Sequence, residues 1–141
     1  MTLARTLKQA KRYDEALAAA DEAARIVAAE HKPPFAGLAF LRGDLLARLG
    51  RNDAAEAAFR QEIALSPADA RAYRSLIILL ITEGRPEQAT PLVYQLLQAA
   101  PTAENFAAIV ETMQVVGDEA GVRYWAAQAH ARFPNDARFR R

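Results

Sequence analysis

Apolar residues recur along this chain in helical stretches that short polar turns separate. The longest apolar run, from Leu76 to Ile81, is followed by Glu83, Gly84 and Arg85 and then by a second helical stretch. No segment alternates apolar and polar residues with period two over a useful length, which argues against strands. The pattern predicts about eight helices, with the ranges Leu3–Ala10, Asp14–Glu30, Phe35–Leu49, Asp53–Leu65, Ala68–Thr82, Pro86–Ala99, Ala103–Val116 and Glu119–Arg132.

Glycine and proline recur along the chain with a common period. The first series is Gly50, Gly84 and Gly117, and the second is Pro33, Pro67, Pro101 and Pro134. Glycine after an apolar stretch permits the positive φ of a helix C-terminus, and proline fits a first helical turn but not an interior. Both series have a period of about 34 residues, which in a helical sequence indicates stacked helix-turn-helix repeats.

On this period, residues 1–141 form one predicted domain with an incomplete first repeat over 2–35. Full repeats follow at 36–69, 70–102 and 103–136, and a short basic tail spans 137–141. The first helix of the incomplete repeat is too short, so we expect that the chain is a fragment or meets another domain at this edge. Two local expectations concern helix starts. Ser66 is predicted to cap the helix after it, and Pro91 to delay or kink the helix around it.

The repeats resemble the tetratricopeptide repeat along nearly the whole chain. The resemblance rests on Tyr13-Asp14-Glu15-Ala16-Leu17, on Leu49-Gly50-Arg51-Asn52 and on Ala72-Tyr73, together with small residues at helix contacts such as Gly43. It implies an all-α, right-handed α-solenoid. It also implies a non-enzymatic protein-interaction scaffold that binds a peptide or helix in a concave groove lined by the first helix of each repeat.

The repeat alignment places eight candidate partner-binding residues on that groove: Phe40, Asp44, Arg71, Arg74, Ile78, Ile81, Glu111 and Gln114. Packing against neighbouring helices accounts for most of the run 76–81, but not for Ile78 and Ile81, which share the groove face. Two alternatives stay open. The isoleucines belong to the core, or the charged residues Asp44, Arg71 and Arg74 form only a local ion-pair cluster.

Some tetratricopeptide proteins clamp a peptide's terminal carboxylate with lysine, asparagine and arginine. The positions of the clamp asparagine hold Asp44, Ile78 and Glu111 here, and those of the clamp lysine include Phe40 and Arg74. Only the arginines offer similar chemistry, so the sequence argues against recognition of chaperone tails.

Composition excludes several classes of function. The net charge is +1, cysteine is absent, and no apolar run approaches the ~20 residues of a membrane span. The two histidines, His31 and His130, lie in different repeats without metal-ligand spacing, and no nucleophile has a partner base. The sequence therefore predicts no enzyme activity, no cofactor, no metal and no membrane partner. The absence of a visible signal peptide favours the cytoplasm.

Three further interpretations concern the C-terminal part. Arg132-Phe133-Pro134-Asn135-Asp136 and the cluster Arg138–Arg141 loosely resemble the C-terminal repeat tails of some bacterial enzymes, including sulfatase-like ones, which implies an accessory domain that docks on a catalytic domain. Arginines offer weak nucleic-acid binding, which the near-neutral charge argues against. These are Arg123, Arg132, Arg138, Arg140 and Arg141. Finally, we expect Phe133 or Phe139 to fold back over the last repeat, or a second copy to cover it in a twofold homodimer.

Overall fold

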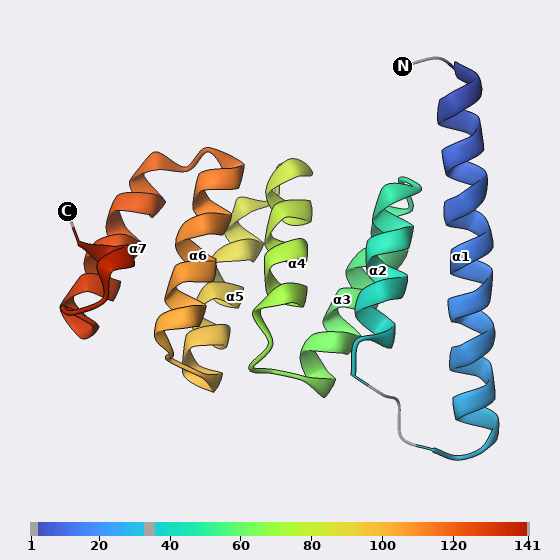
Figure 1. Cartoon of the computed structure of the whole chain (residues 1–141), viewed down its shortest axis with the longest axis horizontal. Coiled ribbons are helices and arrows are strands. Elements are labelled where there is room, and N and C mark those ends of the chain that lie inside the picture. Colours follow the sequence, from blue (N-terminus) through green and yellow to red (C-terminus); the bar gives the residue numbers. More distant parts are fainter. Residues whose placement is uncertain (1–2, 33–35, 141) are drawn as a thin grey trace. The chain divides into compact units, whose positions relative to one another are not determined.

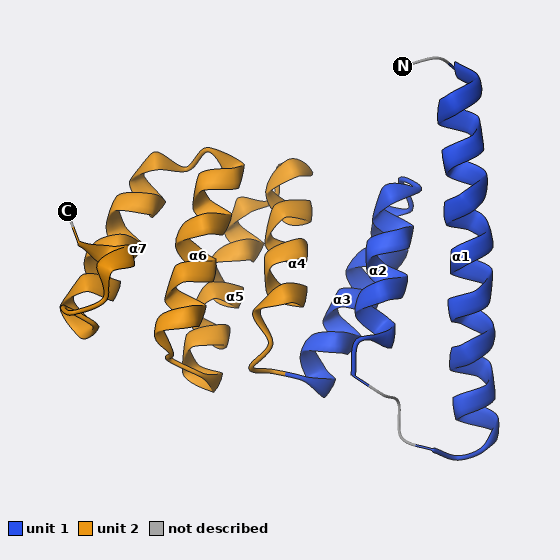
Figure 2. Cartoon of the chain, in the orientation of Figure 1, with its two compact units in different colours: residues 1–66 blue, residues 67–141 orange. Residues whose placement is uncertain are grey.

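A computed structural model describes residues 3–32 and 36–140, which form seven α-helices, one short 3₁₀ helix and no strand (Figure 1). The chain divides into two compact units, residues 1–66 and 67–141, which Figure 2 distinguishes by colour. Unit 1 holds α1 (Leu3–Ala29), α2 (Leu38–Arg48) and α3 (Asn52–Leu65). Unit 2 holds α4 (Ala70–Thr82), α5 (Pro86–Ala99), α6 (Ala103–Val116), α7 (Glu119–Arg132) and the 3₁₀ helix η1 (Ala137–Phe139). The predicted all-α class is confirmed, and a single domain over 1–141 stays a prediction.

The same hydrogen-bonded turn ends the first helix of each pair. At α2, the Gly50 N–H donates to the carbonyl of Ala47 and the Arg51 N–H donates to that of Leu46. Equivalent pairs of bonds surround Gly84 after α4 and Gly117 after α6. The three glycines have φ of 75°, 76° and 77°, the left-handed conformation that this type of helix ending requires and that other residues adopt only at a cost. The helix breaks predicted from the glycine spacing are therefore confirmed.

The break predicted between Ala10 and Asp14 is wrong, because α1 is one helix of 27 residues. The glycines of the first two turns lie five residues before an alanine, Gly50 before Ala55 and Gly84 before Ala89. The matching alanine in α1 is Ala16, so the turn position is occupied by Lys11. Lysine in the left-handed conformation costs roughly 1–2 kcal/mol, whereas the helix accepts it without strain. The helix therefore continues through this position, which leaves seven α-helices among the described residues rather than eight.

Unit 1 is built around α2, which packs against both α1 and α3. The contact with α3 centres on Gly43, where a Cβ atom would lie 2.6 Å from Cε1 of the Phe59 ring. Phe59 is fully buried, so its ring occupies the space that Gly43 leaves. The absence of a side chain at residue 43 thus sets how closely the two helices approach.

A buried carboxylate from α3 completes the other end of α2. The N-cap residue of α2 is Gly37, which has no side chain to accept the free N–H groups of the first turn. Glu62, only 1% exposed, accepts the Gly37 N–H at 3.0 Å on one carboxylate oxygen and the Phe40 N–H at 3.2 Å on the same oxygen. These bonds and the positive end of the α2 dipole compensate for burying the charge.

In unit 2, α4 packs against α5 and α6, and α6 packs against α7. Two buried polar side chains fasten the connecting loops to this core. The Tyr73 hydroxyl donates to the carbonyl of Pro67 at 2.8 Å, and the Asn105 amide donates to the carbonyl of Ala100 at 2.9 Å and to that of Ala68 at 3.4 Å. Burial raises the pKa of Tyr73, which keeps its hydroxyl protonated as a donor.

Both expectations about helix starts need correction. The N-cap of α4 is Asp69, whose carboxylate accepts the Arg71 N–H at 3.0 Å, and Ser66 instead lies at the C-cap of α3. Helix α5 begins at Pro86, its first-turn proline, and runs through Pro91 to Ala99, so the predicted late start is wrong. Aspartate and serine are equally good N-cap residues, so the sequence alone did not distinguish Asp69 from Ser66.

The C-terminal residues fold back onto unit 2, as one of the two sequence alternatives predicts. Phe139 in η1 is only 4% exposed and packs with Phe106 and Phe133. Asp136 caps η1 through the Arg138 N–H at 3.0 Å, and the Arg138 guanidinium pairs with the same carboxylate at 2.6 Å. Chiefly this guanidinium lowers the pKa of Asp136 to about 2. The carboxylate therefore favours the folded tail above pH ~4, and this contribution is lost as the pH falls through 2.

We expect Gly43→Ala to destabilise the protein although alanine favours helices. The new methyl group would overlap a buried ring, which costs roughly 1–3 kcal/mol, against about 1 kcal/mol gained in helix propensity. Urea unfolding of the single variants and of Gly43→Ala with Phe59→Leu measures the coupling. The second substitution should recover part of the loss, and simple additivity of the two effects would contradict the close contact.

We expect Phe139→Ala to lower the free energy of unfolding by about 3 kcal/mol, because it uncovers Phe106 and leaves a cavity. Trp125, the only tryptophan in the sequence, packs against the same cluster, so its fluorescence reports the transition. Arg140→Ala, an exposed change in the same segment, is the matched control. Equal stability of the two variants would show that the tail does not cover this end.

Candidate functional site

The strongest candidate surface in unit 2 lies on α4. Its buried side carries Leu76, Leu79 and Leu80, whereas Ile78 and Ile81 are half-buried and lie three residues apart on another face. A helix that needed only one apolar face would carry polar residues at these two positions. The two isoleucines therefore expose apolar surface that packing within the described part of unit 2 does not use completely.

Charged and polar residues flank the exposed isoleucines. Arg74 is exposed one turn before Ile78 on α4, and Glu111 and Gln114 are exposed on α6, which packs beside α4. Glu111 is the equivalent of Ile78 in the next repeat. The arrangement places opposite charges on neighbouring helices, so a ligand on this surface meets a cation on α4 and an anion on α6.

Arg71 belongs to the start of α4 rather than to this surface. Its guanidinium contacts the Asp69 carboxylate at 2.7 Å, and this contact chiefly lowers the pKa of Asp69. Arg71 is largely solvated and Asp69 is half-buried, so the pair contributes little to stability. Arg71 thus forms an ion pair with Asp69, a residue that the expected cluster of Asp44, Arg71 and Arg74 did not include.

The two remaining predicted residues, Phe40 and Asp44, lie on α2 in unit 1. The half-buried Phe40 ring packs against the ring of Phe59, with centroids 6.0 Å apart. Asp44 pairs with Arg48 one turn later on the same helix at 3.0 Å. Each residue thus has a partner inside its own unit. Their membership of one groove with the residues of α4 and α6 stays a prediction.

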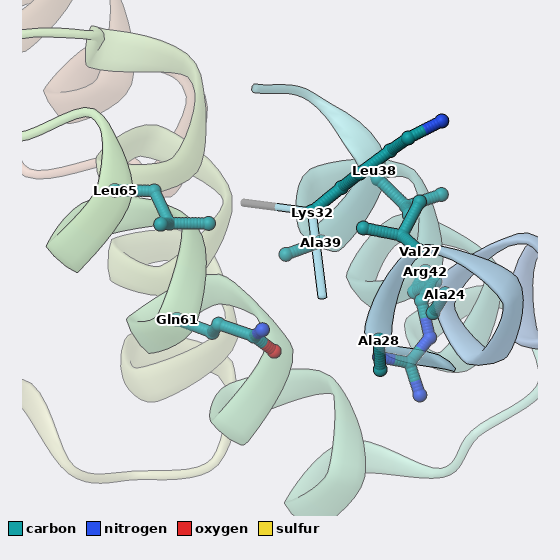
Figure 3. A pocket seen from close by; sticks show the side chains of 9 residues that line it. All are labelled: Ala24, Val27, Ala28, Lys32, Leu38, Ala39, Arg42, Gln61 and Leu65. Carbon is teal, nitrogen blue, oxygen red and sulfur yellow. The ribbon is translucent and has the colours of Figure 1, made fainter. Parts of the chain in front are cut away.

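Unit 1 also contains a hollow that the sequence did not predict (Figure 3). It encloses about 250 Å³ between α1, α2 and α3, and its apolar lining includes Val27, Leu38 and Leu65. Its two cations are already matched. Lys32 pairs with Glu30 at 2.6 Å, and Arg42 pairs with Asp21 at 2.8 Å. The hollow has room for a small apolar side chain, but its charges are mutually compensated.

A second unpredicted feature is an aromatic cluster on α5 and α7 of unit 2. The Trp125 ring makes edge contacts with Tyr94 and Tyr124, at centroid distances of 5.4 Å and 5.0 Å. Both tyrosines are 50% exposed, and their hydroxyls interact, which raises the pKa of Tyr94. A hollow of about 380 Å³ lies against them. The repeat alignment drew attention to first helices only and so passed over these second-helix aromatics.

The C-terminal arginines are mostly engaged by groups of unit 2. Arg138 pairs with Asp136 and lies 3.6 Å from Glu104, and Arg132 lies over the Phe106 ring. Arg140 contacts the carbonyl of Asn135 at 3.4 Å, and Arg141 lies outside the described residues. These contacts hold the tail in place, whereas Arg123 is exposed on α7.

Within residues 3–32 and 36–140, no three histidine, aspartate or glutamate side chains gather closely enough to hold a metal ion. Over the same ranges, no helix has the length and apolarity that crossing a bilayer requires.

Comparison with known proteins supports the repeat assignment. Residues 40–104, slightly less than half of the chain, match the family model of the tetratricopeptide repeat. No curated protein matches the chain, so the loose resemblance to repeat tails of sulfatase-like enzymes gains no support. The matched segment runs from α2 into α6, and α6 and α7 repeat the same helix-turn-helix pattern beyond it. The chain is thus an all-α helical-repeat protein whose residues 40–104 are similar to the tetratricopeptide repeat, and such repeats generally mediate protein–protein interaction.

Proposed function

We propose that this chain is a non-enzymatic interaction module that binds a peptide or helix of a protein partner on the exposed face of α4 and α6. The observation that carries the proposal is the incomplete burial of Ile78 and Ile81 in a helix whose other large apolar residues are buried. Exposed apolar residues with a charged rim are typical of peptide-binding surfaces.

The chemistry of the surface describes the ligand. Its anchor is one or two aliphatic or aromatic side chains that cover Ile78 and Ile81, each contributing roughly 1.5–3 kcal/mol when fully buried. A carboxylate of the ligand lies near Arg74, and a cation lies near Glu111. The charges set the orientation and the association rate more than the affinity.

A selection experiment tests the site without a known partner. Peptides are selected from a random displayed library on the whole chain, and their affinities are then measured for Ile78→Asp. We expect at least a tenfold loss, because an unpaired carboxylate replaces the apolar anchor. Gln98→Asp, an exposed change on α5, is the matched control and should leave the affinity unchanged. Circular dichroism confirms that each variant is folded.

Two results would contradict the proposal. Equal affinity of the selected peptides for both variants would place the binding surface elsewhere. Loss of helicity in Ile78→Asp would assign Ile78 to the core. In that case Arg74→Glu, an exposed substitution that does not disturb packing, still tests the surface through a changed preference for acidic peptides. Phe40→Ala is avoided here, because the Phe40 ring supports Phe59 in unit 1.

A further inference from the structure

Helix α1 is in register with the second helices of the other repeats. Ala16 of α1 corresponds to Ala55 of α3, and Ala55 corresponds in turn to Ala89 of α5. Each of these alanines lies five residues after the turn position, which holds Lys11 in α1 and Gly50 and Gly84 in the next two repeats. The surroundings of these three alanines can therefore be compared directly.

One face of α1 is exposed, whereas the equivalent face of α3 and of α5 is buried. Ala55 and Ala89 are 0% and 3% exposed, whereas Ala16 is exposed. One turn further on, Ala58 of α3 is buried but its equivalent Ala19 is exposed. Ile26, at the C-terminal edge of the same face, is 44% exposed, and its equivalent in α3, Leu65, is 40% exposed, so the difference between the helices lies at Ala16 and Ala19.

The other repeats show what covers this face. On α3 this face carries Glu62, which reaches the first turn of α2. Helix α2 is the first helix of the same repeat, and α3 packs extensively against it. In α1 the contact with α2 uses a different face, the one that carries the buried Leu17, Ala20 and Val27. The face of Ala16 and Ala19 therefore corresponds to the surface that an antiparallel first helix occupies in the later pairs, and Ile26 lies at its edge. No helix within the described residues of unit 1 occupies it.

The same face becomes cationic toward the N-terminus of α1. Successive residues of a helix are about 100° apart, which places Arg5, Lys8 and Arg12 in line with Ala16, Ala19 and Ile26. Lys11 adds a fourth positive charge nearby, and no carboxylate occurs between Leu3 and Tyr13. This face, which we call the open face, is thus apolar over one half and basic over the other.

We propose that the open face binds an amphipathic α-helix of a partner protein, which packs antiparallel to α1 in the way that α2 packs on α3. Charge complementarity fixes the chemistry of this helix. Its N-terminal half is apolar and covers Ala16, Ala19 and Ile26. Its C-terminal half is acidic and lies beside Arg5, Lys8 and Arg12, where the negative end of its dipole is also favourable. The site is separate from the α4–α6 surface and does not depend on it.

The test uses a labelled synthetic peptide with the sequence of residues 38–49, the helix that covers the equivalent face of α3, followed by four glutamates. Its affinity for the whole chain is measured by fluorescence anisotropy, beside that of a control peptide ending in four lysines. We expect the acidic peptide to bind about tenfold more tightly or better, with an advantage that falls at high salt.

Two matched variants locate the binding face. Ala19→Asp places a carboxylate on the open face, and Ala18→Asp places the same group on an exposed position about 100° around the helix. The first should weaken the acidic peptide at least tenfold, and the second should leave its affinity nearly unchanged. Both alanines are exposed, so both variants should keep wild-type helicity by circular dichroism.

Three outcomes would overturn the proposal. Equal binding of the acidic and basic peptides would remove the charge argument. Equal affinities of Ala18→Asp and Ala19→Asp would place any binding on another face. A dimer in sedimentation equilibrium that Ala19→Asp dissociates would show that a second copy of this chain, rather than a partner helix, covers the open face.

Discussion

The left-handed turn at the end of each first helix is the constraint on which the repeat pairs depend. It reverses the chain within a few residues, so that the second helix returns along the first and the two can share a core. Gly50, Gly84 and Gly117 adopt this conformation with nearly the same φ. After α1 a residue other than glycine, His31, takes the left-handed conformation with a φ of 54°, which costs some strain. The repeat pattern is thus enforced at the turns, and packing inside each pair follows from it.

The helix pairs expose two kinds of surface. First helices carry more apolar residues than their packing uses, as Ile78 and Ile81 show on α4. Second helices carry an apolar face that only a first helix covers, and α1 exposes such a face. Both surfaces arise from the logic of stacked pairs, in which each helix has neighbours on two sides. A helix bound to either of the two proposed surfaces would therefore make the same kind of contact as the helices of a pair make with each other.

The sequence predicted the features that depend on local backbone geometry. The glycine turns and the close approach at Gly43 follow from residue type and spacing, whereas the fold-back of Phe139 was one of the alternatives that the sequence left open. It failed where a tertiary contact or a missing signal decided the result. In the sequence Glu62 looks like an ordinary helix-surface residue. Its role depends on a tertiary contact with the N-terminus of α2, whose N–H groups it accepts. Lys11 was the signal for an unbroken α1, but it is visible only when the repeats are compared position by position. The predicted groove combines residues of α2 with residues of α4 and α6. It requires one placement of the two units, and periodicity does not specify that placement.

The unbroken α1 has a thermodynamic consequence at its N-terminal end. Toward this end α2 meets α1 at Tyr13, whose ring and hydroxyl contact Arg48. Residues 3–9 beyond it are all exposed, so this stretch has little tertiary packing to hold it. An isolated helical stretch of about ten residues is only marginally stable in water, and this end should open far more readily than the rest of the helix. Any ligand that grips it must also supply the free energy that orders it, so its affinity is coupled to a local folding equilibrium rather than to contact area alone.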